Sequence, residues 1–205
     1  MPNEGVIKFS LDFHPGPAPS TEVIADVNRW RQRLFALKMI GQDSARYDGF
    51  GFGNVSVRGD DGFWITGTQT GGLEQLDTAH YVLVIGADTD SNAVTAVGPL
   101  KPSSEALTHA ALYQAGVEVG CVLHVHAPEL WRNAAELGLP LTDALVPYGT
   151  PQMSDEVTRL FRETAGMGQR LFAMGGHEDG LVAFGATPDV AGGAIEAALE
   201  RLATL

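Results

Sequence analysis

One short stretch with the sequence Cys-Val-Leu-His-Val-His constrains the fold of this chain more than any other. It overlaps an apolar run over residues 119–125, bounded by a glycine and a proline, which predicts a buried strand. Successive side chains of a strand point to opposite faces, so His124 and His126 project from the same face. Leu123 and Val125 then face the other way. The strand therefore has one apolar face and one face that carries two imidazoles.

Two imidazoles at this spacing, with Cα atoms about 7 Å apart, can converge on one ion. The alternative is that these histidines are hydrogen-bonded or partly exposed, because the pattern is short. Glu105 and His177 are the candidates for further ligands, and three histidines with a carboxylate suit zinc or another borderline divalent ion. Glu105 also fits a helix start, where a carboxylate favours the helix dipole. His177 also fits an exposed position in a glycine-rich turn.

Composition indicates a compact globular chain of one domain, with 205 residues, 44% hydrophobic residues and 19% charged residues. Glycine is over-represented, with 25 residues in short clusters that predict tight turns and close backbone approaches. Residues 1–20 contain four prolines and little periodicity. We expect an irregular N-terminal arm over residues 1–20 and a single domain over residues 21–205.

The net charge of −12 argues against a nucleic-acid partner, because phosphate backbones are bound by basic surfaces. Cys121 is the only cysteine, which rules out an internal disulfide and is typical of a reducing compartment. The N-terminus lacks a charged segment followed by an apolar one, and no apolar run approaches the roughly 20 residues that span a bilayer. We expect a cytoplasmic protein without a membrane segment.

Periodicity along the chain predicts an α/β fold with a mixed sheet. Apolar residues at helical spacing between Val23 and Leu37 predict a first helix, with Thr21 as a plausible N-cap. Further helices are expected over residues 103–115, 129–137, 155–165 and 188–202. Strands are expected over residues 54–58, 62–66, 81–85, 93–97, 119–125, 170–174 and 180–184.

From about residue 27 to residue 202 the sequence resembles the class II aldolase/adducin family. Five anchors occur in the order of that family: residues 53–58 (Gly-Asn-Val-Ser-Val-Arg), 65–68 (Ile-Thr-Gly-Thr), 101–105 (Lys-Pro-Ser-Ser-Glu), the histidine pair, and His177 ahead of Gly185. The resemblance implies a three-layer α/β/α domain whose central sheet is mixed and largely antiparallel. It also implies a homotetramer with sites at subunit boundaries.

The resemblance further implies a zinc or similar ion bound by His124, His126 and His177, with Glu105 beside it to exchange protons. A metal polarises a carbonyl and stabilises the enediolate that forms when a proton or a carbon–carbon bond is lost. A nearby carboxylate serves as general base.

Substrate phosphate, by the same resemblance, is bound by Asn54, Gly67, Ser103 and Ser104. The residues agree with that role, because Ser103 and Ser104 are expected to open a helix whose free N–H groups favour an anion. The loop over residues 66–72 can add further amides. The alternative is helix capping by serine and an ordinary turn glycine.

Two departures from the family pattern leave the exact reaction open. Family aldolases use a tyrosine after the histidine strand, but the matching segment here is shortened. Its only tyrosine is Tyr148, and the alternative is that the family position falls near Ala144. The family also has glycine directly after its third histidine, whereas Glu178 and Asp179 intervene here before Gly180. These two acidic residues orient a ligand, act as an acid or base, or face water.

The leading hypothesis is therefore a metal-dependent lyase of aldol type that acts on a small phosphorylated or polyhydroxylated ketose. A sugar-phosphate epimerase or dehydratase is the alternative within enzymes, because the same site serves all three reactions. A metal-free, adducin-like interaction module is the alternative of a different class.

Overall fold

An eight-stranded sheet runs through the centre of the protein, in the order β1-β7-β6-β5-β4-β8-β10-β9. The computed structural model describes residues 6–164 and 166–205. The strands are β1 (Ser10–Pro15), β4 (Asn54–Gly59), β5 (Gly62–Thr66), β6 (Tyr81–Asp88), β7 (Ala93–Gly98), β8 (Cys121–His126), β9 (Leu171–Ala173) and β10 (Gly180–Gly185). Among these eight described strands only β1 and β7 pair in parallel, so the sheet is mixed and largely antiparallel, as predicted.

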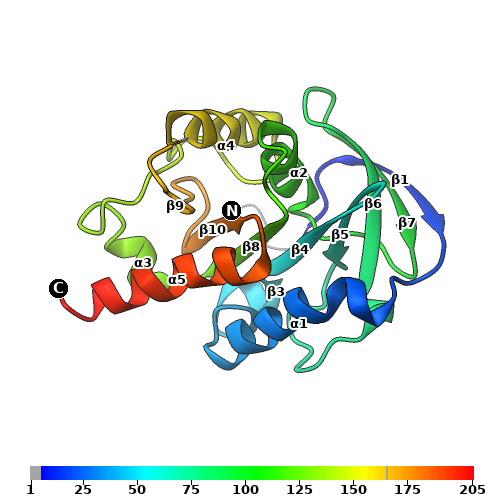
Figure 1. Ribbon diagram of the computed structural model, residues 1–205, viewed down its shortest axis with the longest axis horizontal. Coiled ribbons are helices and arrows are strands. Elements are labelled where there is room, and N and C mark those ends of the chain that lie inside the picture. Colours follow the sequence, from blue (N-terminus) through cyan, green and yellow to red (C-terminus); the bar gives the residue numbers. More distant parts are fainter. Residues whose placement is uncertain (1–5, 165) are drawn as a thin grey trace.

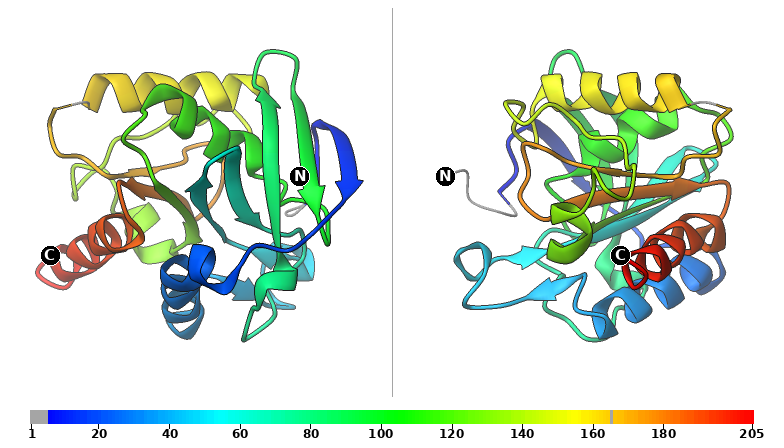
Figure 2. Two further views of the ribbon diagram at one scale, coloured as in Figure 1. Left: turned by 45° about the vertical axis from the view of Figure 1, so that its right-hand side comes forward. Right: turned by 90° about the vertical axis from the view of Figure 1, so that its left-hand side faces the viewer.

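Helices cover both faces of the sheet and complete three layers (Figures 1 and 2). On one face lie α1 (Thr21–Ala36), α3 (Pro128–Arg132) and α5 (Pro188–Leu202), and on the other lie α2 (Ala106–Ala115) and α4 (Pro151–Thr164). Two very short strands, β2 (Gly41–Gln42) and β3 (Gly51–Phe52), pair as a separate hairpin. Among the described residues, no helix is long and apolar enough to cross a membrane. The α/β class and the layer arrangement predicted from the sequence are confirmed.

Strand β8 lies between β4 and β10, and its two faces differ as the sequence predicts. Leu123 and Val125 belong to the core between the sheet and helices α1 and α5. Val122 belongs to the core on the side of α2 and α4, and His124 and His126 follow it on that face. All six residues of β8 are buried. The histidines are therefore fixed in the middle of the sheet, under the layer formed by α2 and α4.

The expected irregular arm needs a correction, because residues 10–15 form strand β1. Ser10 pairs with Ala93 and the strand adds a parallel edge to β7. In this edge strand every second side chain is at most half-buried and the others are exposed. The alternation of apolar and polar residues is therefore weak, which explains why the sequence did not indicate a strand. Residues 1–5 of the same arm lie outside the described part of the chain.

Several helix ends also differ from the prediction. Helix α2 begins at Ala106 rather than at Ser103, because the Ser103 N–H is bound by the carbonyl of Thr66 and residues 103–105 form a turn. Helix α3 ends at Arg132, short of the predicted residue 137. Thr21 is the first helical residue of α1 instead of its N-cap.

Helices α1 and α5 pack through a glycine that lies against the ring of Trp30. A Cβ atom added at Gly192 would overlap the Trp30 ring, whereas one added at Gly193 would meet nothing within 4 Å. The Trp30 ring cannot easily move, because its Nε1 donates a 2.6 Å hydrogen bond to Asp189. The two adjacent glycines therefore differ sharply in how much space they leave.

We expect Gly192→Ala to lower the free energy of unfolding by about 1–3 kcal/mol, because the added methyl group forces overpacking at this contact. Gly193→Ala is expected to raise it by about 0.5–1 kcal/mol, since alanine favours the helix more than glycine does. Urea unfolding of both variants measures the difference. Equal effects from the two substitutions would contradict the packing of α5 on α1.

Candidate active site

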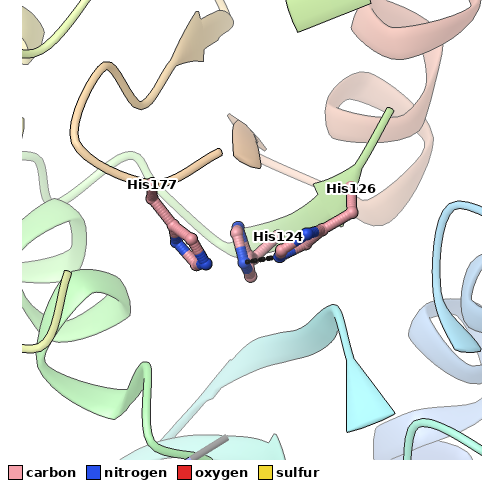
Figure 3. Close-up of side chains that lie close together, drawn as sticks. All are labelled: His124, His126 and His177. Carbon is pink, nitrogen blue, oxygen red and sulfur yellow. Dashed lines mark hydrogen bonds between the residues drawn. The ribbon is translucent and has the colours of Figure 1, made fainter. Parts of the chain in front are cut away.

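Three buried histidines converge under helix α2, and they are the three predicted from the sequence. His124 and His126 project from β8, and His177 comes from the loop between β9 and β10 (Figure 3). One ligand nitrogen of each histidine lies within 4.8 Å of those of the other two. The Nε2 atoms of His124 and His126 are 3.2 Å apart. This spacing fits three ligands of a single ion.

The protonation of His124 is set by a backbone contact. Its Nδ1 lies 3.1 Å from the carbonyl oxygen of Leu181, which can only accept, so Nδ1 carries the proton and Nε2 keeps the lone pair. Burial, and then the neighbouring His177, hold the pKa of His124 well below its ordinary value. The pKa of His126 is lowered for the same reasons. Neutral imidazoles with a free lone pair are the form that binds metals, so the donor set fits a divalent ion.

Glu105 lies beside this cluster, immediately before helix α2. One carboxylate oxygen is 3.9 Å from His177 Nδ1, and the other accepts a 2.8 Å hydrogen bond from the Thr108 hydroxyl. The side chain is 1% exposed. The described residues that could hold an ion as one cluster are the three histidines, and Glu105 lies next to them. Its position suits a base that acts next to a metal-bound substrate.

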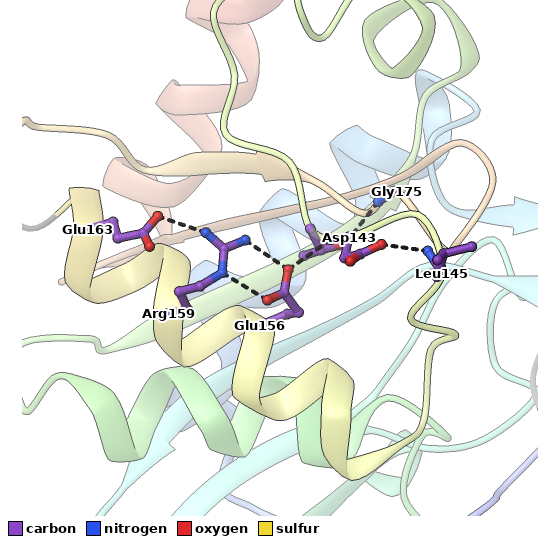
Figure 4. A network of polar contacts seen from close by, with 7 residues as sticks. Asp143, Leu145, Glu156, Arg159, Glu163 and Gly175 are labelled. Carbon is purple, nitrogen blue, oxygen red and sulfur yellow. Dashed lines mark hydrogen bonds and ion pairs between the residues drawn. The ribbon is translucent and has the colours of Figure 1, made fainter.

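The loop that carries His177 packs directly on the segment between α3 and α4. A Cβ atom at Gly176 would overlap the carbonyl oxygen of Val146, so only glycine allows this approach of two backbones. The Gly175 N–H donates a 2.9 Å hydrogen bond to the Thr142 hydroxyl. Figure 4 shows how Glu156 on α4, bound to Arg159, accepts from the Asp143 N–H at 2.7 Å. Helix α4 thus supports the third histidine through this segment.

Tyr148, whose role the sequence left open, lies against His177. The two ring centroids are 4.5 Å apart with an interplanar angle of 23°, which is a stacked arrangement. Lys8 covers the other face of the tyrosine, with its Nζ 3.4 Å from the ring centroid, and donates a hydrogen bond to the Tyr148 carbonyl. The N-terminal segment therefore reaches the edge of the histidine cluster.

The two acidic residues after His177 take different positions. Glu178 is exposed, whereas Asp179 is buried and accepts a 2.7 Å hydrogen bond from the Tyr47 hydroxyl. Arg46 pairs with the same carboxylate at 3.6 Å. Sequence reasoning missed Arg46 and Tyr47, because they lie in a polar turn with no periodicity and contact the site only through the fold.

The four residues expected to bind phosphate come together in one small cavity. The cavity is lined by Gly51, Gly53, Asn54, Gly67, Thr68, Gln69, Thr70, Gly71, Ser103 and Ser104. Asn54 pairs with His124 across β4 and β8, so this cavity adjoins the histidine cluster. None of these ten described residues carries a charge. An anion here would be held by hydroxyl, amide and backbone N–H groups.

Comparison with known proteins adds a family match. The model of the Class II Aldolase and Adducin N-terminal domain matches residues 42–205. Among solved structures, L-fuculose-1-phosphate aldolase from Thermus thermophilus superimposes with a TM-score of 0.68 at 18% identity, over 90% of this chain and 93% of that one. A sugar-phosphate aldolase from Thermotoga maritima gives a TM-score of 0.65 at 16% identity, over 89% and 94%. At these identities the likeness concerns the fold alone.

Closer sequence relatives match over shorter segments. A methylthioribulose-1-phosphate dehydratase from Leptospira interrogans is 42% identical over 84 residues, which are 38% of this chain and 32% of that protein. The corresponding dehydratase of Leptospira borgpetersenii is 34% identical over 118 residues, or 51% and 47%. The chain thus matches less than half the length of these relatives.

We expect Thr142→Val to loosen the loop that carries His177. The substitution leaves the half-buried Gly175 N–H without its acceptor, which should lower the free energy of unfolding of the metal-free protein by about 1 kcal/mol. Thr142→Ser keeps the hydroxyl and serves as the matched control. Urea unfolding measures the effect, and a valine variant as stable as the serine variant would show that this hydrogen bond contributes little.

Proposed function

The chain belongs to the class II aldolase/adducin family, and on that premise we propose that it is a divalent-metal-dependent lyase of a small phosphorylated ketose. The observation that carries the proposal is the convergence of three buried histidines beside a buried glutamate. A metal-free interaction module has no evident need for such a cluster, because taking imidazole and carboxylate groups out of water costs free energy.

His124, His126 and His177 would hold the ion, and zinc is the first candidate for a site of three imidazoles. When bound, the ion supplies a Lewis acid that polarises the substrate carbonyl and stabilises negative charge on its oxygen. For loss of water, Glu105 would take the proton from the carbon beside that carbonyl and pass it to the departing hydroxyl, which leaves as water. For aldol cleavage, Glu105 would instead protonate that carbon after the carbon–carbon bond has broken. Thr108 holds one oxygen of this carboxylate in place, which leaves the other directed toward His177.

Asn54, Gly67, Ser103 and Ser104 would bind the phosphate of the substrate. The described residues that line their cavity include no cationic side chain, and the whole chain has a net charge of −12. The phosphate would therefore be held by hydrogen bonds from neutral groups, with the nearby ion supplying the positive potential. Such a pocket selects for the geometry of a phosphate rather than for negative charge in general.

Loss of water is the first reaction to test, because the relatives with the higher sequence identity are dehydratases of methylthioribulose 1-phosphate. Aldol cleavage, the leading hypothesis from the sequence, starts from the same polarised carbonyl and is the second candidate. Tyr148, the only tyrosine of the shortened segment, is buried and stacked on His177, and its part in either reaction stays open. The homotetramer expected from the sequence stays a prediction.

We expect the double variant His124→Ala/His126→Ala to lose its metal and its activity, while Glu105→Gln keeps the metal and loses at least about 100-fold in kcat. Metal content is measured by mass spectrometry. Activity is measured as loss of water from methylthioribulose 1-phosphate and as cleavage of fuculose 1-phosphate. Wild-type protein that binds no divalent ion would rule out this function and favour an interaction module.

The phosphate pocket has a separate test. Ser104→Ala should raise KM for a phosphorylated ketose about tenfold with little change in kcat, because a binding interaction of about 1.4 kcal/mol is lost equally from substrate and transition state. Ser154→Ala, at a buried serine of α4 outside the pocket, is the control. A larger fall in kcat than rise in KM would place Ser104 in the chemical step instead.

A further inference from the structure

We propose that Tyr47, held between Arg46 and Asp179, is a positioning residue that fixes the His126 ring and the loop of His177 for metal binding. The proposal rests on the metal site described above. It concerns the hairpin over residues 41–52, which is formed by β2, β3 and the turn between them, and to which the sequence assigned no function.

Tyr47 contacts the second histidine ligand through its ring. The ring centroids of Tyr47 and His126 are 4.6 Å apart in an edge-to-face arrangement, with an interplanar angle of 71°. Phe52 lies 5.4 Å from the same imidazole and 5.0 Å from the tyrosine ring. Two aromatic rings of the hairpin therefore limit the rotation of His126, whose own backbone is fixed in β8.

The hydroxyl of Tyr47 contacts the segment that carries the third ligand. It donates a 2.7 Å hydrogen bond to Asp179, which is buried and lies two residues after His177. The Asp179 carbonyl accepts from the Ala127 N–H directly after β8, and the Gly180 N–H returns to the His177 carbonyl. Tyr47 thus contacts both segments that carry metal ligands, although it lies 132 residues before Asp179 in the sequence.

Arg46 completes this contact. Its guanidinium lies 4.8 Å from the Tyr47 ring centroid and 5.0 Å from the Phe52 ring centroid, and hydrogen-bonds to the Tyr47 hydroxyl. The same guanidinium pairs with Asp179 at 3.6 Å and so balances the charge of a carboxylate placed close to the ion site. Arg46 also lines a cleft of about 800 Å³ beside the hairpin, and Tyr47 is half-buried behind it.

The backbone on both sides of the Tyr47–Asp179 hydrogen bond has dihedral angles that are rare for residues other than glycine. Tyr47, Asp48 and Asp179 have φ values of 51°, 56° and 64°, in the left-handed region that non-glycine residues seldom occupy. Such conformations persist where surrounding contacts determine them, and they cluster at functional sites. Here two segments remote in sequence adopt them at the two ends of one hydrogen bond. The contact is therefore built to hold a fixed geometry.

The phenol acts through the ligands and not on the substrate, because its proton is directed to Asp179. Partners that orient metal ligands typically contribute 10- to 100-fold to metal affinity. Removing the Tyr47 hydroxyl while keeping its ring should therefore lower the affinity for the metal without abolishing metal binding.

The test is a titration of the metal-free protein with cobalt(II), in competition with a chelator and followed by visible absorption. We expect Tyr47→Phe to bind cobalt about 10- to 100-fold more weakly than the wild type, with a changed absorption spectrum. Tyr81→Phe is the matched control, because that buried hydroxyl donates to Asn28 on the opposite face of the sheet. Asp179→Asn, which keeps the size of the side chain but removes its charge, provides a second disruption, because it breaks the ion pair with Arg46 and leaves Tyr47 a weaker acceptor.

If both Tyr47→Phe and Asp179→Asn bind cobalt with the affinity and spectrum of the wild type, the positioning role is wrong and the metal site is unaffected. Wild-type protein that binds no cobalt would overturn the metal site as well, so the two failures are distinguishable. If Tyr47→Phe does not fold, the result for Asp179→Asn decides.

Discussion

The structure depends on the placement of strand β8 at a point where both of its faces are buried. Hydrogen bonds to β4 and β10 on either side fix its backbone, and Leu123 and Val125 anchor it in the core beneath α1 and α5. His124 and His126 are consequently held on the opposite face by a scaffold that cannot shift without opening the sheet. Rigid elements position functional groups better than loops do, so the backbone of these two histidines needs no further support, and only the His126 ring is held by the hairpin.

The third histidine reaches the cluster from a loop and needs that support. The supports are a backbone contact at Gly176, the Thr142 hydroxyl and the two tyrosines. Tyr148 stacks on His177 and Tyr47 meets His126, and each tyrosine ring has a cationic side chain close to it. The surroundings of the cluster are thus aromatic next to the imidazoles and charged further out. The three histidines are thereby buried, which lowers the pKa of His126, and the nearby Arg46 lowers it further.

The sequence predicted correctly those elements whose pattern of apolar residues matches the faces that they bury in the fold. The histidine strand, the meander over residues 54–98 and helix α5 follow from alternation, helical spacing and turn residues. It failed where a contact between distant segments decides the structure. The edge strand β1, for example, depends on its pairing with β7. Arg46 and Tyr47 reach the site only because the hairpin folds back on β8, and no pattern in residues 41–50 encodes that path.

The parallel pairing of β1 with β7 also bears on the order in which the molecule assembles. Strands β4 to β7 are neighbours in the sheet and follow one another in the chain, with residues 67–80 as their longest connection, and local contacts of this kind form early. Strand β1 must instead close a long loop before its contacts form, which delays it. Lys8 precedes β1 and covers Tyr148, so the wall behind His177 is expected to be completed late, after the sheet that carries the other two histidines.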